Sequence, residues 1–287
     1  MSVLKAKDLV KSYGRRLVVK GVNLEVGAGE IIGLLGRNGA GKTTTFQMVV
    51  GLIKPDHGTI SFDGQDISRS TTPERAKLGI TYLPQENSVF LKASVEENLR
   101  LILELLPYEK EEKETLSREL LEELGLLALA KQSAHSLSGG ERRKLEICRS
   151  LVLKPKFLLL DEPFTGIDPL TIIELQKIML SLKNRGIGII ISDHNVRDTL
   201  RITDRACILD EGEVLVEGTP ERIAADAKAR EKFLGKDFEL AGPAPNLPPK
   251  NNDRPGFPQE SKGTGKNKAG VGANKKPGQE EAQLKLF

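Results

Sequence analysis

GRNGAGKT, residues 36–43, is the stretch of sequence that decides the fold. It fits the pattern G-x-x-x-x-G-K-[ST], and it has the context that this pattern requires, with the apolar segment IIGLL before it and the helical segment TTFQMVVG after it. In such a loop the glycines let backbone N–H groups turn inward on a phosphate, Lys42 reaches the β- and γ-phosphate oxygens, and the Thr43 hydroxyl can bind Mg²⁺. The stretch therefore predicts a nucleotide-binding loop between a strand and a helix. The residues expected to contact the nucleotide are Gly36, Arg37, Asn38, Gly39, Ala40, Gly41, Lys42, Thr43 and Thr44.

Two adjacent acids end a second informative segment, FLLLDEP, residues 157–163. Its apolar residues predict a buried strand, and a nucleotide-binding sheet holds its metal at the carboxyl edge of such strands. Because side chains alternate across a strand, Asp161 and Glu162 are expected to point differently. We expect Asp161 to be the partner of Mg²⁺ and Glu162 to polarise the attacking water. A solvated strand end is the alternative.

Short apolar segments alternate with amphipathic segments along the chain, which predicts an α/β fold with a partly parallel sheet. Strands are expected at residues 30–35, 59–62, 79–83, 157–160, 187–192 and 206–209. Residues 3–26 predict instead an N-terminal antiparallel β subdomain. Ser94 and Glu97 form a capping-box pattern at the start of an all-helical insertion of about residues 94–152.

The last 47 of the 287 residues, from Ala241, contain seven Gly and seven Pro, and are expected to be a disordered tail. The tail has eight Lys or Arg and four Asp or Glu, so its net charge is +4. Since the whole chain has a net charge of +3, residues 1–240 carry −1. The basic character therefore does not indicate a nucleic-acid-binding face on the folded part. The two cysteines, Cys148 and Cys207, are expected to be buried free thiols, and no apolar run predicts a membrane span or a signal peptide.

The segment SLSGGE, residues 136–141, contains glycines where a purely structural helix would avoid them. Ser138 and Glu141 form a capping-box pattern, but Gly139 and Gly140 each cost a helix about 1 kcal/mol relative to alanine. A helix N-terminus with bare backbone is an anion site. The glycines are therefore expected to serve a ligand.

Three single residues are ambiguous when each is taken alone. Gln85 follows the segment GITYL and can reach Mg²⁺ and the attacking water, or it is an ordinary loop glutamine. His194 can contact a γ-phosphate, although a lone histidine at a strand end is more often packed or capping. Tyr13 can stack on adenine, although an aromatic residue near a turn is commonly packed.

In combination, the order and spacing of these features resemble the ATPase subunit of an ABC transporter over residues 2–240. The resemblance rests on Tyr13, GRNGAGKT, Gln85, LSGGE, FLLLDEP, GIDP at residues 166–169, and His194. It implies a P-loop fold that binds ATP and Mg²⁺, with Glu162, His194 and Gln85 as catalytic residues and Thr43, Gln85 and Asp161 at the metal. It also implies a head-to-tail homodimer, in which Ser138, Gly139, Gly140 and Glu141 act on ATP held by the loop of the other copy. Asp168 is a further nucleotide-binding residue that the resemblance implies.

Longer stretches narrow the resemblance to the ATPases of lipopolysaccharide-export transporters. They are YLPQENSVF, SLSGGERRK, DEPFTGIDP, SDHNVRDTL and FLGKDFEL. The resemblance implies a translocase that extracts lipopolysaccharide from the bacterial inner membrane for export to the outer membrane. The ATPases of branched-chain amino acid importers share the layout and are the alternative, as is a soluble non-transport ABC ATPase. Arg37 stands where proline is frequent in this family, a departure that is not expected to disturb the loop.

The resemblance also implies a place at the cytoplasmic face of the inner membrane, with two transmembrane permease subunits as partners. Lipopolysaccharide would then meet this subunit only indirectly. Phe90 and Leu91 are adjacent apolar residues in an expected loop, which is costly unless something covers them. We expect them to line a groove for a permease helix, and packing inside the helical insertion is the alternative. Deletion of residues 241–287, including the closing QLKLF, is expected to leave fold, dimerisation and ATP hydrolysis intact.

Overall fold

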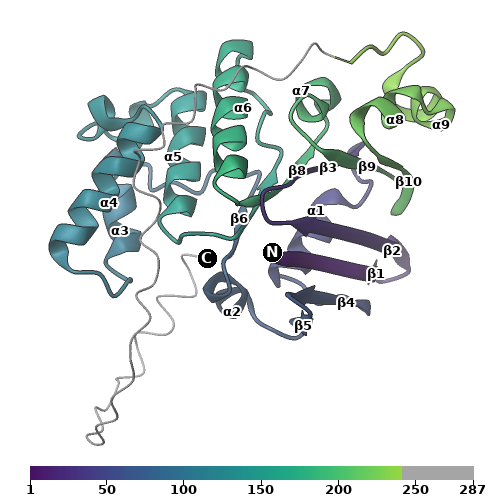
Figure 1. The fold of residues 1–287 in the computed structure, drawn as a ribbon, viewed down its shortest axis with the longest axis horizontal. Coiled ribbons are helices and arrows are strands. Elements are labelled where there is room, and N and C mark those ends of the chain that lie inside the picture. Colours follow the sequence, from purple (N-terminus) through teal and green to yellow (C-terminus); the bar gives the residue numbers. More distant parts are fainter. Residues whose placement is uncertain (241–287) are drawn as a thin grey trace, which may run out of the picture.

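The computed structural model describes residues 1–240, which fold into two β-sheets and a set of surrounding helices (Figure 1). The tail of residues 241–287, with QLKLF at its end, lies outside the described residues. Within residues 1–240, no helix combines the length and the apolar composition that a membrane crossing requires.

The N-terminal sheet is antiparallel, as the sequence predicts, and has the order β2-β1-β4-β5. Its strands are β1 (Val3–Tyr13), β2 (Arg16–Gly27), β4 (His57–Phe62) and β5 (Gln65–Asp66). The strand expected at residues 59–62 therefore belongs to this sheet, where Leu4 pairs with Phe62. Short-range patterning identifies such a strand, but it does not indicate which sheet the strand joins.

The second sheet is mixed and has the order β10-β9-β3-β8-β7-β6. Its strands are β3 (Ile31–Gly36), β6 (Ile80–Leu83), β7 (Phe157–Asp161), β8 (Gly188–Asp193), β9 (Arg205–Asp210) and β10 (Glu213–Gly218). Five strands run parallel, so the nucleotide-binding loop, Gln85 and the acid pair all follow strands at one edge. The sixth, β10, pairs antiparallel with β9. It was not predicted, because its only apolar run, residues 214–216, is short and lies between two glutamates.

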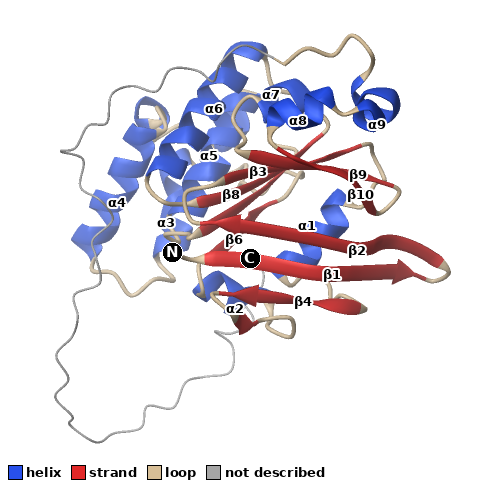
Figure 2. Ribbon diagram, turned by 45° about the vertical axis from the view of Figure 1, so that its right-hand side comes forward, coloured by secondary structure: helices blue, strands red, loops and turns tan. Residues whose placement is uncertain are grey.

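The helices divide between the sheets and the insertion. Those packed near the sheets are α1 (Lys42–Val50), α2 (Thr72–Lys77), α6 (Pro169–Asn184), α7 (Val196–Leu200), α8 (Pro220–Ala225) and α9 (Ala227–Ala229), with a π-helical turn at Arg230–Leu234. The insertion contains α3 (Val95–Leu103), α4 (Lys110–Glu123), the 3₁₀ turns Leu127–Leu129 and Ala134–Ser136, and α5 (Gly139–Leu151). Helix α1 lies between the two sheets, whereas α3 and α4 lie at one end of the molecule (Figures 1 and 2).

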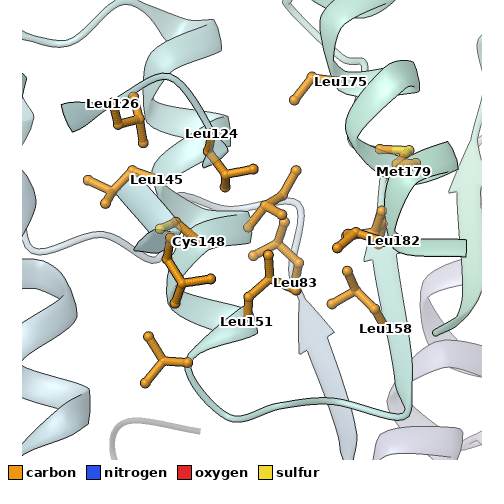
Figure 3. Close-up of a cluster of buried hydrophobic side chains, with 14 of the residues drawn as sticks. Leu83, Leu124, Leu126, Leu145, Cys148, Leu151, Leu158, Leu175, Met179 and Leu182 are labelled. Carbon is orange, nitrogen blue, oxygen red and sulfur yellow. The ribbon is translucent and has the colours of Figure 1, made fainter. Parts of the chain in front are cut away.

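Two large apolar clusters hold these layers together. In the first, Leu145, Cys148 and Leu151 of α5 lie between Leu124 and Leu126 on one side and Met179 and other apolar residues of α6 on the other (Figure 3). The sheet contributes Leu83 and Leu158 to the same cluster. The second cluster joins α1 to both sheets through side chains that include Phe46, Leu9 and Phe157. Both cysteines are buried and free, as expected.

Arg75 of α2 closes the C-terminal end of α1, and only 1% of the residue is exposed. One nitrogen of its guanidinium donates to the carbonyls of Met48 (2.7 Å) and Val49 (2.6 Å), and the others donate to those of Ser70 and Ser68. A cation is favoured here because the last carbonyls of a helix lack intrahelical partners and carry the negative end of its dipole. Burial lowers the pKa of Arg75 to about 10. The helix that follows the nucleotide-binding loop is thus fixed at its far end.

We predict that Arg75→Met lowers the free energy of unfolding by about 3 kcal/mol, because it leaves buried carbonyls without a donor. For a chain of this size the midpoint of thermal unfolding should fall by about 6–12 °C. Scanning calorimetry of the full chain measures this shift. Arg69→Met, which removes an exposed arginine of the same segment, is the control and should change the midpoint little. Equal midpoints for the two variants would contradict the role assigned to Arg75.

Candidate active site

The loop between β3 and α1 presents bare backbone at the edge of the sheet. Gly36 has a φ of 152°, and a Cβ there would lie 2.5 Å from the Leu209 carbonyl oxygen. Gly41 has a φ of 102°, and a Cβ there would lie 2.9 Å from the Val18 carbonyl oxygen. Gly41 is also the N-cap of α1, and no side chain among the described residues caps it. The first N–H groups of α1 are therefore available to an anion.

A cavity of about 350 Å³ opens at this loop. It is lined by Arg16, Val18, Asn38, Gly39, Gly41, Lys42, Thr43, Thr44, Gln85 and Glu162. The sequence analysis named all of these residues except Arg16 and Val18, which come from β2. Tyr13, which was expected to stack on adenine, ends β1 just before Arg16, and it could have indicated that the start of β2 lies beside the loop. Gly36, Arg37, Ala40, Asp161 and His194 do not line the cavity themselves.

Lys42 is 4% exposed and is held by the loop that it follows. Its Nζ donates to the carbonyls of Gly36 (2.9 Å) and Arg37 (3.3 Å). Burial lowers the pKa of Lys42, and the nearby charges of Glu162 and Asp161 oppose this shift. Its ammonium group is therefore already placed beside the cavity. The Arg37 side chain points elsewhere and donates to the Lys232 carbonyl at 2.6 Å.

Asp161 is fully buried, and each of its carboxylate oxygens accepts a hydrogen bond from a hydroxyl group. Tyr82 of β6 donates to Oδ2 at 3.1 Å, and Ser192 of β8 donates to Oδ1. The Arg143 guanidinium of α5 donates to the Asp161 backbone carbonyl at 3.0 Å. Tyr82, Ser192 and Arg143 lie in stretches quoted above, but their contacts with Asp161 were not predicted, because they join segments that are distant in the sequence.

Glu162 points differently from Asp161, as the alternation of side chains predicts, and its φ of 47° turns the chain where β7 ends. Its N–H donates to the Ser192 carbonyl, and its Oε2 accepts from Gln85 Nε2 and from Thr165 Oγ1, both at 3.1 Å. His194 Nδ1 lies 3.4 Å from the same oxygen. Gln85 and His194 thus both lie close to the Glu162 carboxylate, beside the cavity.

These residues suit a nucleoside triphosphate with Mg²⁺. The cavity volume falls in the range of small-molecule sites, and bare amides with a lysine recognise phosphates. No group of three or more His, Cys, Asp or Glu within residues 1–240 could hold a metal ion by itself. Proteins usually bind Mg²⁺ through one or two carboxylates together with substrate phosphates. Thr43, Gln85 and Asp161 are the oxygen donors that would hold it, and when bound it would neutralise phosphate charge.

Ser138, Glu141 and Asp168 lie outside the cavity. Ser138 and Glu141 form the expected capping box, in which Glu141 N–H donates to Ser138 Oγ at 3.2 Å and Ser138 N–H donates to Glu141 Oε2 at 2.8 Å. These bonds lower the pKa of Glu141. Asp168 caps α6 by accepting from the backbone N–H and the hydroxyl of Thr171.

The missing side chain at Gly140 also has a packing role, which was not predicted from the sequence. A Cβ at Gly140 would lie 2.3 Å from Thr171 Cγ2, so α5 approaches the first turn of α6 closely. At Gly139 a Cβ would meet only ordinary contacts, the nearest being Ile167 Cδ1 at 3.7 Å. Close packing on α6 is therefore a second reason for the missing side chain at Gly140, beside the expected contact with a ligand.

The remaining expected site residues lie on the surface. Tyr13 is 50% exposed, with Lys11 Nζ 5.9 Å from its ring centre. Phe90 and Leu91 are each 39% exposed, so neither is enclosed by the helical insertion. The Asn98 side chain fixes the backbone of Phe90 through two hydrogen bonds, and the Arg149 guanidinium lies 4.9 Å from the ring centre.

Comparisons with known proteins agree on the family. Residues 19–165 match the protein family described as "ABC transporter". The chain is 50% identical over 238 residues to the "Lipopolysaccharide export system ATP-binding protein LptB" of Acidithiobacillus ferridurans, which covers 83% of this chain and 99% of that protein. It is 47% identical over 241 residues to the protein of the same name from Escherichia coli strain K12, covering 84% of this chain and 100% of the relative. The ADP-form crystal structure of MJ1267, an ATP-binding cassette of an ABC transporter, is similar with a TM-score of 0.75 and 29% identity, over 82% of this chain and 100% of that one.

We predict that Glu162→Gln keeps nucleotide affinity and lowers the turnover of ATP by about 10²-fold or more, because it removes a proton acceptor and leaves the loop intact. Nucleotide binding by calorimetry and phosphate release measure the two effects. Glu86→Gln changes an exposed glutamate of the neighbouring loop and should leave both unchanged. Full turnover in Glu162→Gln would exclude the assigned role.

Proposed function

The chain belongs to the ABC transporter family of ATP-binding proteins, and from this premise we propose that it is the ATP-hydrolysing motor subunit of a lipopolysaccharide-export transporter. The observation that supports hydrolysis most directly is that Lys42 and Glu162 line the same cavity. The cargo is proposed from relatives of that name, which are 47–50% identical and are matched over 99–100% of their length.

Hydrolysis follows from the positions of the chain's own groups. Loop amides and Lys42 bind the phosphates, and Glu162 accepts the proton of a water that attacks the γ-phosphorus. The P–O bond to the β-phosphate breaks, and ADP and phosphate leave. Gln85 and His194, both close to Glu162 Oε2, orient the water and the transferred group.

We place the second half of each nucleotide site on a second copy of the chain. Ser138, Gly139, Gly140, Glu141 and Asp168 lie outside the cavity of their own copy. The start of α5 nevertheless lies next to Asp168, because Gly140 packs on Thr171 and the Thr171 hydroxyl donates to Asp168. A head-to-tail homodimer presents this unit to the ATP held by the partner, where the N-terminus of α5 suits an anion.

Phe90 and Leu91 provide the surface for a permease helix. Both are exposed apolar residues, and the nearby Ser88 is bonded to Glu146 and Arg149 of α5. The Arg143 guanidinium donates to both the Pro84 and Asp161 carbonyls. The loop that leads from β6 to Phe90 and the end of β7 therefore share one hydrogen-bond donor. This arrangement suits a subunit that works at the cytoplasmic face of the inner membrane beside two permease subunits.

A mixture of two inactive variants tests the head-to-tail dimer. Lys42→Ala removes the phosphate-binding lysine, and Ser138→Arg obstructs the start of α5, so each homodimer should be inactive. The heterodimer contains one doubly damaged site and one intact site, and the mixture should regain part of the ATPase rate. Measured rates that stay at background, although cross-linking proves that heterodimers form, would contradict independent shared sites.

Phe90→Ala should weaken assembly with the permease subunits by about tenfold and leave the isolated protein folded, because a partly exposed side chain contributes little to its own fold. Co-purification from membranes and thermal unfolding measure the two effects, and analysis of the lipid that co-purifies with the complex tests the cargo. Leu52→Ala removes a comparably exposed side chain at the end of α1 and serves as the control. A large loss of stability in isolated Phe90→Ala would favour internal packing instead.

A further inference from the structure

Tyr82 contacts both halves of the candidate active site. Its hydroxyl donates to Asp161 Oδ2 at 3.1 Å, and its ring meets the Phe46 ring of α1 edge-on, with ring centres 6.4 Å apart and planes at 76°. Phe46 lies one helical turn after Thr43, and α1 is held from its far end by Arg75. Tyr82 is therefore wedged between the helix that follows the nucleotide-binding loop and the carboxylate expected at the metal.

Asp161 depends on this contact because it is fully buried. A buried carboxylate is costly unless hydrogen bonds satisfy its oxygens, and Tyr82 and Ser192 supply one to each oxygen. They belong to β6 and β8, the strands on the two sides of β7. The carboxylate is thus held from both neighbouring strands, which fixes its plane and leaves further lone pairs for a metal or for metal-bound water.

A phenylalanine at position 82 would fill the same space and keep the contact with Phe46. Packing alone therefore gives no reason for the hydroxyl group. Its one hydrogen-bond partner in the described part of the chain is Asp161.

We propose that Tyr82 is a positioning residue for Mg²⁺, whose hydroxyl orients the Asp161 carboxylate toward the metal while its ring sets the spacing between that carboxylate and α1. This proposal rests on the proposed ATPase function. Partners that orient metal ligands typically change metal affinity by 10–100-fold when they are removed. The hydroxyl of Tyr82 should accordingly matter for nucleotide binding in the presence of Mg²⁺ and not in its absence.

The test is calorimetry of ADP binding to the full chain, once with Mg²⁺ and once with EDTA. Tyr82→Phe should lower the affinity with Mg²⁺ by about tenfold and leave the affinity in EDTA within about twofold of the wild type. The Mg²⁺ concentration needed for half-maximal ATP hydrolysis should rise to a similar extent. Tyr108→Phe removes the hydroxyl of a half-buried tyrosine in the insertion and is the matched control.

Ser192→Ala is the second variant, because it removes the other hydroxyl and keeps the tyrosine ring. It should show the same selective loss with Mg²⁺. The proposal fails if Tyr82→Phe behaves like Tyr108→Phe, or if it loses affinity equally with Mg²⁺ and with EDTA, since the second result indicates a general role in packing. If the wild-type chain binds no nucleotide under either condition, the proposed function itself fails.

Discussion

Close approach between backbone segments is the constraint on which the rest of the structure depends. The nucleotide-binding loop lies against the carbonyls of Leu209 and Val18 at distances that a Cβ would not allow. Gly41 and Gly36 make this contact possible, and the loop is thereby pressed between the end of β9 and the N-terminal sheet. Asn38, Gly39 and Gly41 of the loop line the cavity. The position of Lys42, and through it that of the whole site, follows from this contact.

The catalytic groups are held by a network of contacts that crosses the molecule. Helix α5 supplies the buried ion pair of Arg143 and Glu146 (2.7 Å), in which Glu146 also accepts from the Ser88 N–H. Arg143 in turn contacts the backbone at Pro84 and at Asp161. Removal of one partner from such a buried pair is strongly destabilising, so the loop that carries Gln85 cannot move independently of α5. The segment from Pro84 to Ser88 and the end of β7 are therefore both held by α5.

The sequence predicted the parts of the structure that depend on local pattern. The loop from Gly36, the acid pair Asp161–Glu162 and the strands of the parallel sheet all have short-range signatures, and the structure places them at one sheet edge. Contacts between distant segments have no such signature. The hydroxyl groups that hold Asp161 and the packing of Gly140 on Thr171 became visible only in three dimensions. The edge strand β10 was missed because its apolar run, residues 214–216, is short and lies between two glutamates.

The bonds of Lys42 to the Gly36 and Arg37 carbonyls have a consequence for which anions the site admits. A ligand that arrives meets an ammonium group that already donates to two backbone carbonyls. It must exchange with two carbonyl dipoles, and the gain in free energy is only the difference between the new contact and the old ones. A singly charged, weakly coordinating anion such as chloride gains little by this exchange, whereas a polyphosphate gains through several oxygens at once. The loop thereby selects anions by charge density as well as binding them.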